Sequence, residues 1–308
     1  MGQIKVTKKT GFCFGVRRAV TMAEDALDKY KSICSLGSII HNRQVVDNLS
    51  RMGLKVVKDI RKMKKGTAIV ISSHGLSPRI LKDISKRGIK VIDTTCPFVV
   101  KAQKITRHLT QDGYKVVIVG DVDHPEVKAL VDIAPKKVIV VRDKLEAGAI
   151  RFNKNDRVGI ISQTTQSTSD FLDVVKAMSE NGPKEIRIIN TICNDAEERQ
   201  RLAKALAKRV DLMLIIGGKM SANTRRLFEV CKKILRNSHL VETEKDLKPN
   251  WLKKSSLVGL TSGASTPDWV IRRVIERINL KLKKQNAKLK FKTKNLGPKD
   301  RAILNFAL

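Results

Sequence analysis

The sequence predicts an α/β protein in which three similar modules with mostly parallel sheets surround a central cavity about a pseudo-threefold axis. Three observations support this prediction. Strand-like and helical patterns alternate along the 308 residues. One short pattern, in which β-branched residues lead to a Cys and then to an amphipathic helix, occurs three times. A polar turn follows each of the other predicted strands, where parallel sheets gather their ligand sites.

The first turn of each module contains the recurring cysteine. Segments 5–27, 91–109 and 187–206 place Cys13, Cys96 and Cys193 at the same point between strand and helix. Cys34 and Cys231 lie outside the repeat and are interpreted as small buried apolar residues. Five widely spaced cysteines without a CxxC pair argue against both a disulfide framework and a ribbon-type zinc site.

The second and third turns of each module contain further polar residues. The second turns, in segments 34–49, 116–130 and 212–230, contain His41, His124 and Asn223, which lie 28, 28 and 30 residues after the module's cysteine. The third turns, in segments 68–84, 158–175 and 257–275, contain His74, Thr164 and Ser265. We expect all nine positions to face the cavity. Ordinary turn composition explains any one of these turns, but explains the recurring cysteine poorly.

These repeats predict the domain organisation. Residues 14–96 form the first module, residues 97–193 the second and residues 194–280 the third, with the N-terminal strand in residues 1–13 joining the third module. Residues 281–308 depart from the repeat and are predicted to be a basic, solvated C-terminal tail whose apolar end packs on a module.

Three cysteine thiolates that converge on one cavity suit an iron–sulfur cluster. A [4Fe–4S] cluster takes four thiolates, so Cys13, Cys96 and Cys193 would leave one iron open, as catalytic metal sites require. Two alternatives remain. The cysteines could be buried structural residues, or they could bind zinc together with histidines, although the threefold symmetry does not favour zinc.

The remaining polar residues indicate an anion site with a proton donor. His41, His74 and His124, with Ser221, Asn223, Ser265 and nearby helix N-termini, can bind an anion such as phosphate. Helix N-capping explains the serines and Asn223 almost as well. Glu126 in the HPEV segment could stay protonated in a closed cavity and donate a proton, with Thr164 relaying it. A helix-dipole role for Glu126 is an equal alternative.

The charge balance is strongly basic. The chain has 62 Lys and Arg against 30 Asp and Glu, a net charge of +32. This is consistent with a basic surface alone, or with attraction of a phosphorylated substrate, an acidic electron carrier or nucleic acid. Only 4% of the residues are aromatic, and the basic residues are spread along the chain, so nucleic acid is not expected as the main partner. The chain lacks a secretory signal or a membrane-length apolar run, which predicts a cytoplasmic protein without membrane association.

The motifs together resemble the LytB/IspH family of 4-hydroxy-3-methylbut-2-enyl diphosphate reductases. The resemblance runs from about Gly11 to about Ile275, and the segments that carry it are GFCFGV, HNRQVV, SSHG, DTTCPFV, GDVDHPEV, SQTT, NTIC with the following ERQ, SAN and SGAS. It implies reductive removal of a hydroxyl group from an allylic diphosphate. The products would be isopentenyl and dimethylallyl diphosphate, at the last step of the non-mevalonate isoprenoid pathway.

The resemblance also implies roles for individual residues. The substrate hydroxyl would bind the open iron, and Glu126 would deliver protons with assistance from His124 and Thr164. The implied substrate-binding residues are His41, His74, His124, Thr164, Ser221, Ala222, Asn223 and Ser265. Ala222 stands where many relatives carry Ser, so one diphosphate hydrogen bond is missing or comes from the backbone. Ferredoxin or flavodoxin would supply electrons. A regulatory iron–sulfur protein is the rival hypothesis, and it would not need Glu126.

Overall fold

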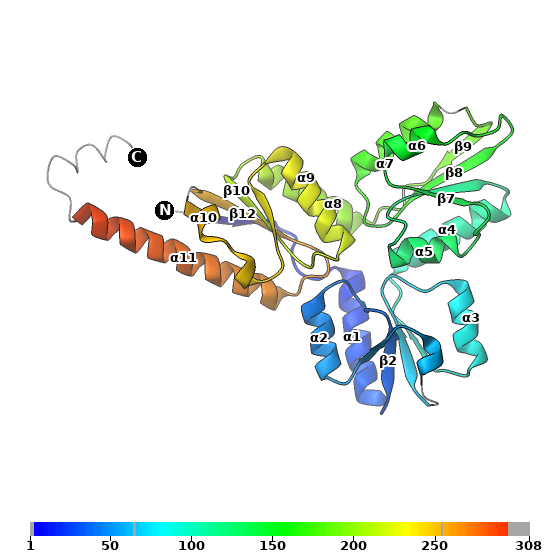
Figure 1. Ribbon diagram of the computed structural model, residues 1–308, viewed down its shortest axis with the longest axis horizontal. Coiled ribbons are helices and arrows are strands. Elements are labelled where there is room, and N and C mark those ends of the chain that lie inside the picture. The colour runs from blue at the N-terminus through cyan, green and yellow to red at the C-terminus, as the bar shows by residue number, and fades with distance from the viewer. Residues whose placement is uncertain (1–2, 64–65, 181, 254, 295–308) are drawn as a thin grey trace.

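The computed structural model describes residues 3–63, 66–180, 182–253 and 255–294. Within these ranges the chain forms three separate sheets, each of four parallel strands with helices packed around it (Figure 1). The strand orders are β3-β2-β4-β5, β7-β6-β8-β9 and β1-β12-β10-β11. The predicted fold class of three similar, parallel α/β modules is therefore confirmed.

The first sheet and its helices come from the N-terminal third of the chain. The strands are β2 (Ile33–Leu36), β3 (Lys55–Val57), β4 (Ala68–Ile71) and β5 (Val91–Asp93). The helices are α1 (Phe14–Lys29), α2 (Arg43–Arg51), the 3-10 helix η1 (Ile60–Lys62) and α3 (Pro78–Lys86).

The second sheet repeats this alternation. Its strands are β6 (Lys115–Val119), β7 (Val138–Val141), β8 (Arg157–Ser162) and β9 (Glu185–Ile188). The helices around it are α4 (Pro97–Gln111), α5 (Pro125–Val131), α6 (Lys144–Ala149) and α7 (Thr168–Ser179).

The third sheet combines both ends of the described chain. Its strands are β1 (Gln3–Val6), β10 (Leu212–Ile216), β11 (Ser238–Val241) and β12 (Leu257–Ser262). The helices are α8 (Asn194–Ala207), α9 (Ala222–Ile234), the 3-10 helix η2 (Glu244–Asp246), α10 (Pro249–Lys253) and α11 (Asp268–Lys294). β1 pairs in parallel with β12, from Gln3 opposite Leu257 to Val6 opposite Leu260.

The central strands explain why the sheets form. β4 (AIVI) and β10 (LMLII) are buried along their whole length. Continuous β-branched and aliphatic runs are typical of parallel strands covered by helices on both faces. The turns at the carboxyl ends of these strands carry the polar residues, because a strand end is where the backbone leaves the apolar layer.

The third module extends beyond its predicted limit. α11 continues past residue 280 to Lys294, so the predicted boundary falls inside a helix. Leu282 packs in the core of the third module, and the Nζ atom of Lys281 donates to the carbonyl of Leu247 at 2.7 Å. The predicted packing of the apolar tail end, around Ile303–Phe306, lies outside the described residues. We propose three domains, which are residues 14–96, residues 97–193, and residues 194–294 together with β1.

Among the described residues, no helix combines the length and the apolar character needed to cross a membrane.

Candidate active site

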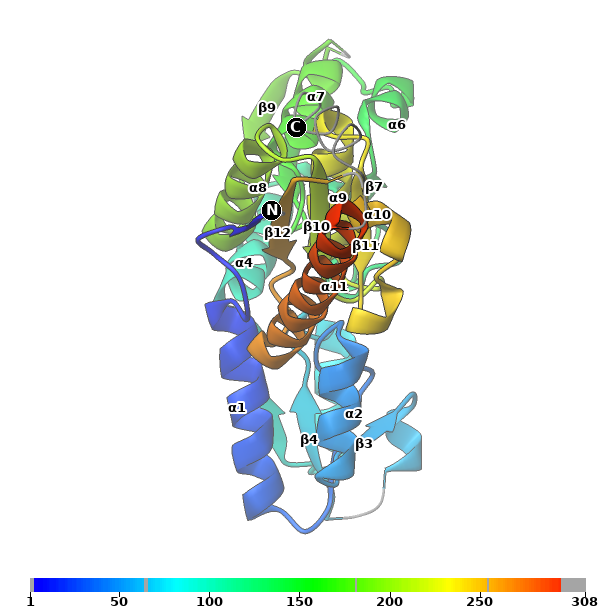
Figure 2. The same cartoon turned by 90° about the vertical axis from the view of Figure 1, so that its left-hand side faces the viewer.

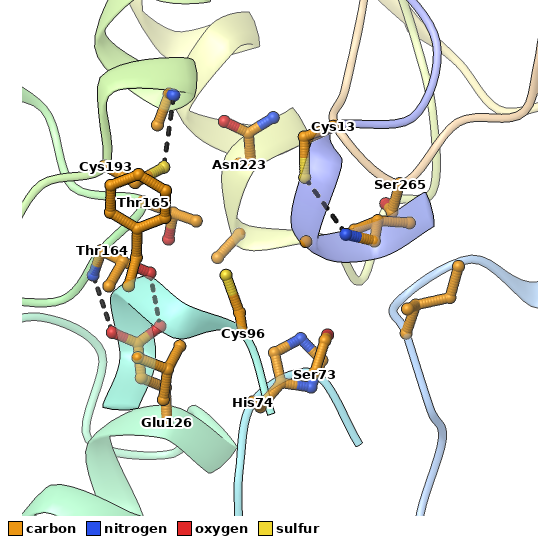
Figure 3. Close-up of a pocket in the computed structure, with 18 of the residues that line it drawn as sticks. Cys13, Ser73, His74, Cys96, Glu126, Thr164, Thr165, Cys193, Asn223 and Ser265 are labelled. Carbon is orange, nitrogen blue, oxygen red and sulfur yellow. Dashed lines mark hydrogen bonds between the residues drawn. The ribbon is translucent and has the colours of Figure 1, made fainter. Parts of the chain in front are cut away.

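A cavity with an empty volume of about 690 Å³ lies where the three modules meet. Its lining includes all twelve residues singled out from the sequence: Cys13, His41, His74, Cys96, His124, Glu126, Thr164, Cys193, Ser221, Ala222, Asn223 and Ser265. The labelled cysteines, Glu126 and His74 surround the same space in Figure 3. The structure thus places all twelve residues in one cavity. The role of each residue stays a prediction.

Each recurring cysteine precedes a helix, and the side chains of Cys13 and Cys193, but not that of Cys96, accept a hydrogen bond from the first helical turn. Cys13, Cys96 and Cys193 are the N-cap residues of α1, α4 and α8. Their backbone N–H groups donate to the carbonyls of Ala264, Ser73 and Thr164 at 3.0, 3.0 and 2.9 Å, so each cysteine is fixed to the third turn of a module. Helix N-termini stabilise negative charge, and the three thiols are therefore positioned where thiolates are favoured.

Burial of the three thiols opposes this effect. It raises the pKa of the thiols of Cys13 and Cys96, and it raises the pKa of Cys193 to about 12. The other two thiols add to the shift at Cys193 by charge repulsion. A bound metal reverses such a balance, because it deprotonates a coordinating thiol. The donor set and its electrostatics therefore fit a cationic metal group.

Gly15 keeps two of the cysteine turns in contact. A Cβ atom at this position would lie 2.6 Å from the Sγ of Cys96 and 3.3 Å from its Cβ. The first helical turn after Cys13 thus packs directly on the side chain of Cys96, and only glycine leaves room for its sulfur.

We expect Gly15→Ala to displace the sulfur of Cys96. Although Ala favours helix by about 1 kcal/mol, overpacking costs about 1–3 kcal/mol, so the variant should be less stable and bind less iron. Thermal unfolding and iron per chain measure both effects. Gly148→Ala in α6 is the control, because a Cβ there meets no atom within 4 Å. A Gly15→Ala protein with full iron content and an unchanged melting temperature would contradict this packing argument.

Glu126 is buried and paired with Thr164. One carboxylate oxygen accepts from the backbone N–H of Thr164 at 2.7 Å, and the other accepts from its hydroxyl at 2.8 Å. The side chain is 1% exposed. Burial raises the pKa of Glu126 to about 7, while the two hydrogen bonds from Thr164 oppose the shift. The carboxyl group therefore titrates near neutral pH, as a general acid must.

The three predicted histidines form a cluster. The ring centroids are 4.3 Å apart between His41 and His74, 5.3 Å between His41 and His124, and 5.2 Å between His74 and His124. Burial lowers the pKa of His41 and His74 and lowers the pKa of His124 to about 3. The rings are therefore neutral at pH 7. A bound anion would stabilise their protonated forms.

This cluster could also hold a metal ion, since one nitrogen from each ring lies within 4.8 Å of the others. The Nδ1 atom of His124 already accepts a hydrogen bond from the backbone N–H of Glu126 at 3.3 Å. Among the described residues, His41 Nε2 and His74 Nδ1 are buried without hydrogen-bond partners. These buried polar atoms are available to bind a polar ligand.

The third module completes the polar wall. Ser221 caps α9 by accepting from the N–H of Thr224 at 3.3 Å, and the hydroxyls of Ser221 and Ser265 lie 3.4 Å apart. Both side-chain polar atoms of Asn223 are buried without partners in the described part of the chain. Ala222 lines the cavity but offers only its backbone N–H, which has no partner within an α-helix at this position. These donors converge as an anion site requires.

The structure changes two of the expected equivalences. In the third turns, matching backbone bonds join Gly75 to Ser72, Gln166 to Gln163 and Thr266 to Gly263. The counterpart of His74 and Ser265 is therefore Thr165, which also lines the cavity, while Thr164 corresponds to Ser73 and Ala264. Counting from the strand end rather than choosing the first Thr would have found Thr165.

The second turns show a similar shift. His124 and Ser221 are both helix N-caps, and each lies four residues after the glycine that ends a strand, Gly120 or Gly217. Ser221 is also 28 residues after Cys193, the interval seen in the other modules. Asn223 is instead the counterpart of Glu126, in the first turn of the helix. The choice of Asn223 over Ser221 as the repeated position was wrong.

Arg199, in the ERQ segment after Cys193, links the turns of two cysteines, a role that was not predicted from the sequence. The side chain is 1% exposed. It donates to the carbonyls of Gly11 and Ser262 at 2.9 and 3.2 Å and pairs with Asp195, two residues after Cys193, at 2.6 Å. A buried guanidinium needs such complete pairing. Its partner Gly11 lies 188 residues away in sequence, so no local pattern identifies the contact.

Comparison with known proteins decides the family. The family model described as LytB protein matches residues 4–279 of this chain. The chain belongs to this family. Two relatives are named 4-hydroxy-3-methylbut-2-enyl diphosphate reductase. The protein from Geobacter metallireducens is 46% identical to this chain, and the protein from Campylobacter concisus is 40% identical. Each match covers 90% of this chain, and 96% and 98% of the relative.

Two solved structures of such reductases are also similar. One, described as the terminal enzyme of the non-mevalonate pathway, is 41% identical with a TM-score of 0.66 and covers 91% of this chain and 99% of its own. The enzyme from Plasmodium falciparum is 27% identical with a TM-score of 0.84 and covers 91% of this chain and 87% of its own. The LytB fold of this chain thus agrees with its sequence relationship.

Proposed function

We propose that this chain reduces 4-hydroxy-3-methylbut-2-enyl diphosphate to isopentenyl and dimethylallyl diphosphate, in the cytoplasm, at a [4Fe–4S] cluster. The reaction breaks the allylic C–O bond, consumes two electrons and two protons, and releases water. The observation that carries the proposal is that three thiols, a buried carboxyl group and a set of histidine, serine and asparagine side chains line the same cavity.

Cys13, Cys96 and Cys193 would hold the cluster. They are three donors from symmetry-related helix N-termini, which leaves one of four irons without a protein thiolate. Among the described residues, the other two cysteines, Cys34 and Cys231, are buried in separate hydrophobic cores and do not line the cavity. When bound, the cluster supplies single electrons and an open coordination position for the substrate hydroxyl.

The chain's own residues would bind and protonate the substrate. The diphosphate would lie among the histidine cluster, Ser221, Asn223 and Ser265, and would use the donors that otherwise lack partners. Glu126 would donate a proton to the departing hydroxyl group, because its carboxyl is substantially protonated at pH 7. Thr164 holds both carboxylate oxygens, and its hydroxyl can pass a proton towards the cavity.

The rival hypotheses make different demands on the cavity. A cluster-bearing sensor needs the three cysteines but has no use for a carboxyl group with a pKa of about 7. A zinc protein needs the histidine nitrogens as ligands. The Nδ1 atom of His124 already accepts a hydrogen bond from the backbone N–H of Glu126, so this atom is not free to bind zinc. The anion-binding donors and the buried acid favour the reductase.

The test is turnover by protein purified and reconstituted without oxygen. With reduced methyl viologen as electron donor, we expect the allylic diphosphate to yield both isomeric products, identified by chromatography and mass spectrometry. Matched samples should lack product when substrate, protein or reductant is omitted. A fully loaded cluster without any product would contradict the proposed reaction and favour the sensor hypothesis.

A further inference from the structure

We propose that the groove between α1 and α4 is the docking site for a small acidic electron-carrier protein. This proposal rests on the proposed function, which requires two electrons per turnover from outside the chain. The groove is lined by Arg18, Thr95, Pro97, Val100, Lys101 and Lys104, together with Asp93. We call it the α1/α4 groove.

The α1/α4 groove lies directly behind one of the three cysteines. Thr95 and Pro97 line the groove, and Cys96 between them lines the central cavity. An Nη atom of Arg18 donates to the carbonyl of Thr95 at 3.3 Å, which joins α1 to the turn before α4. A carrier in the groove would therefore contact the residues on both sides of a proposed cluster ligand in the chain. Electron transfer slows steeply with distance, so a docking site next to a ligand residue favours transfer.

The charge of the groove suits an acidic partner. The lining contains three basic side chains, Arg18, Lys101 and Lys104, and one carboxylate, Asp93. Asp93 already accepts a hydrogen bond from the backbone N–H of Thr95 at 2.9 Å. Lys101 and Lys104 are exposed and form no ion pair with any carboxylate in the described ranges. Unpaired surface cations steer an acidic protein during diffusional encounter.

Two exposed aromatic side chains lie close in the chain to residues that line the groove. Phe14, four residues before Arg18 on α1, is 69% exposed, and Phe98, directly after Pro97, is 36% exposed and also lines the central cavity. α1, α4 and α8, the three helices that follow the cysteines, lie on one side of the molecule in Figure 2. Exposed aromatic side chains within a charged surface are typical of protein interfaces.

The larger cleft between the second and third modules is a poorer candidate. It is lined by five carboxylates and five basic side chains. Several of these pair with one another, including Arg225 with Asp121 at 3.1 Å and Lys233 with Asp170 at 3.5 Å. Such a balanced surface does not select an acidic protein.

The test compares two charge-reversal variants with the same change in net charge. Lys101→Glu/Lys104→Glu alters the α1/α4 groove, and Lys82→Glu/Lys86→Glu alters exposed positions of α3 as the control. Holoenzyme turnover is measured with reduced ferredoxin or flavodoxin, and separately with reduced methyl viologen, which needs no docking site. Iron content is measured in every sample.

We expect the groove variant to lower kcat/KM for the carrier about tenfold or more at low salt. This difference should shrink near 1 M salt, where screening acts within about 3 Å. Its viologen-driven turnover and iron content should match the parent protein. Phe14→Ser should weaken the carrier reaction at both salt concentrations, because apolar contacts are not screened.

Carbodiimide cross-linking gives an independent readout. Carboxylates of a docked carrier should couple to Lys101 or Lys104, and peptide mass spectrometry should locate these bonds.

Four results would overturn the proposal. The control variant could slow the carrier reaction as much as the groove variant, or viologen-driven turnover could fall equally. Cross-links could form only elsewhere. Finally, a short DNA duplex could bind in place of the carrier and lose affinity in the groove variant, which would make this a nucleic-acid surface. Absence of viologen-driven turnover in the parent protein would instead count against the proposed function.

Discussion

Replacing Cys13, Cys96 or Cys193 with Ser is expected to abolish both cluster binding and turnover. Each of the three supplies a thiol from a separate module, and each is fixed by a backbone hydrogen bond to a third turn. The two remaining cysteines belong to other modules. Neither of their thiols can therefore move into the position of the thiol that was removed. Iron and acid-labile sulfide content after anaerobic reconstitution, with the absorption spectrum, should fall from about four irons per chain to a small fraction.

Cys34→Ser is the matched control for this series. Cys34 is 3% exposed within β2 and lies in a hydrophobic core away from the cavity. The substitution should lower the melting temperature because it buries a hydroxyl group, yet it should leave iron content unchanged. Equal iron loss in all four variants would show that global destabilisation, rather than ligation, explains the result.

Glu126→Gln is expected to lower turnover by about 10²- to 10⁴-fold while the cluster stays intact. Gln has the same shape and can still accept from the N–H of Thr164, but it has no acidic proton to donate. Single-turnover rates and iron content, measured on the same samples, separate the chemical step from cluster assembly. Glu180→Gln, an exposed position at the end of α7, serves as the control. Full turnover in Glu126→Gln would remove this residue from the proton path.

The pH dependence should follow the same group. The pKa of Glu126 is raised to about 7, so the protonated donor is present below pH 7 and turnover should decline above it. Glu126→Gln should lack this decline. Because the folded-state pKa exceeds the ordinary value of 4.5, the wild-type protein also loses stability as the pH rises from about 4.5 through 7. The Gln variant should therefore melt at a higher temperature than wild type at pH 8, and this advantage should be smaller at pH 5.

Several features of the fold follow from local sequence patterns. The continuous aliphatic runs of β4 and β10 predict buried parallel strands, and the periodic helices after each cysteine predict the crossovers between them. The repeated Cys identifies three equivalent helix starts, and the structure places all three at N-cap positions. These features depend on hydrophobic periodicity and helix capping, which act over a few residues and are therefore visible in the sequence.

The limits of sequence reasoning appear where a contact joins distant residues. Thr165 and Ser221 are a different case, because the distance from the strand end and the 28-residue interval from Cys193 identify them in the sequence itself. The role of Arg199 depends on Gly11 and Ser262, both far from it in the chain. The continuation of α11 past residue 280 depends on packing of Leu282 against the third module.

The sequence by itself thus determined the three-module α/β architecture, the family and the set of residues expected at the centre. Only the tertiary structure decided how those residues act on one another. The Cys96 sulfur packs against Gly15, and the three histidine rings lie within 5.3 Å of each other. Enclosure of Glu126 by three modules raises its pKa to about 7. Desolvation and close approach are properties of the assembled cavity, because each depends on atoms that come together only when the chain is folded.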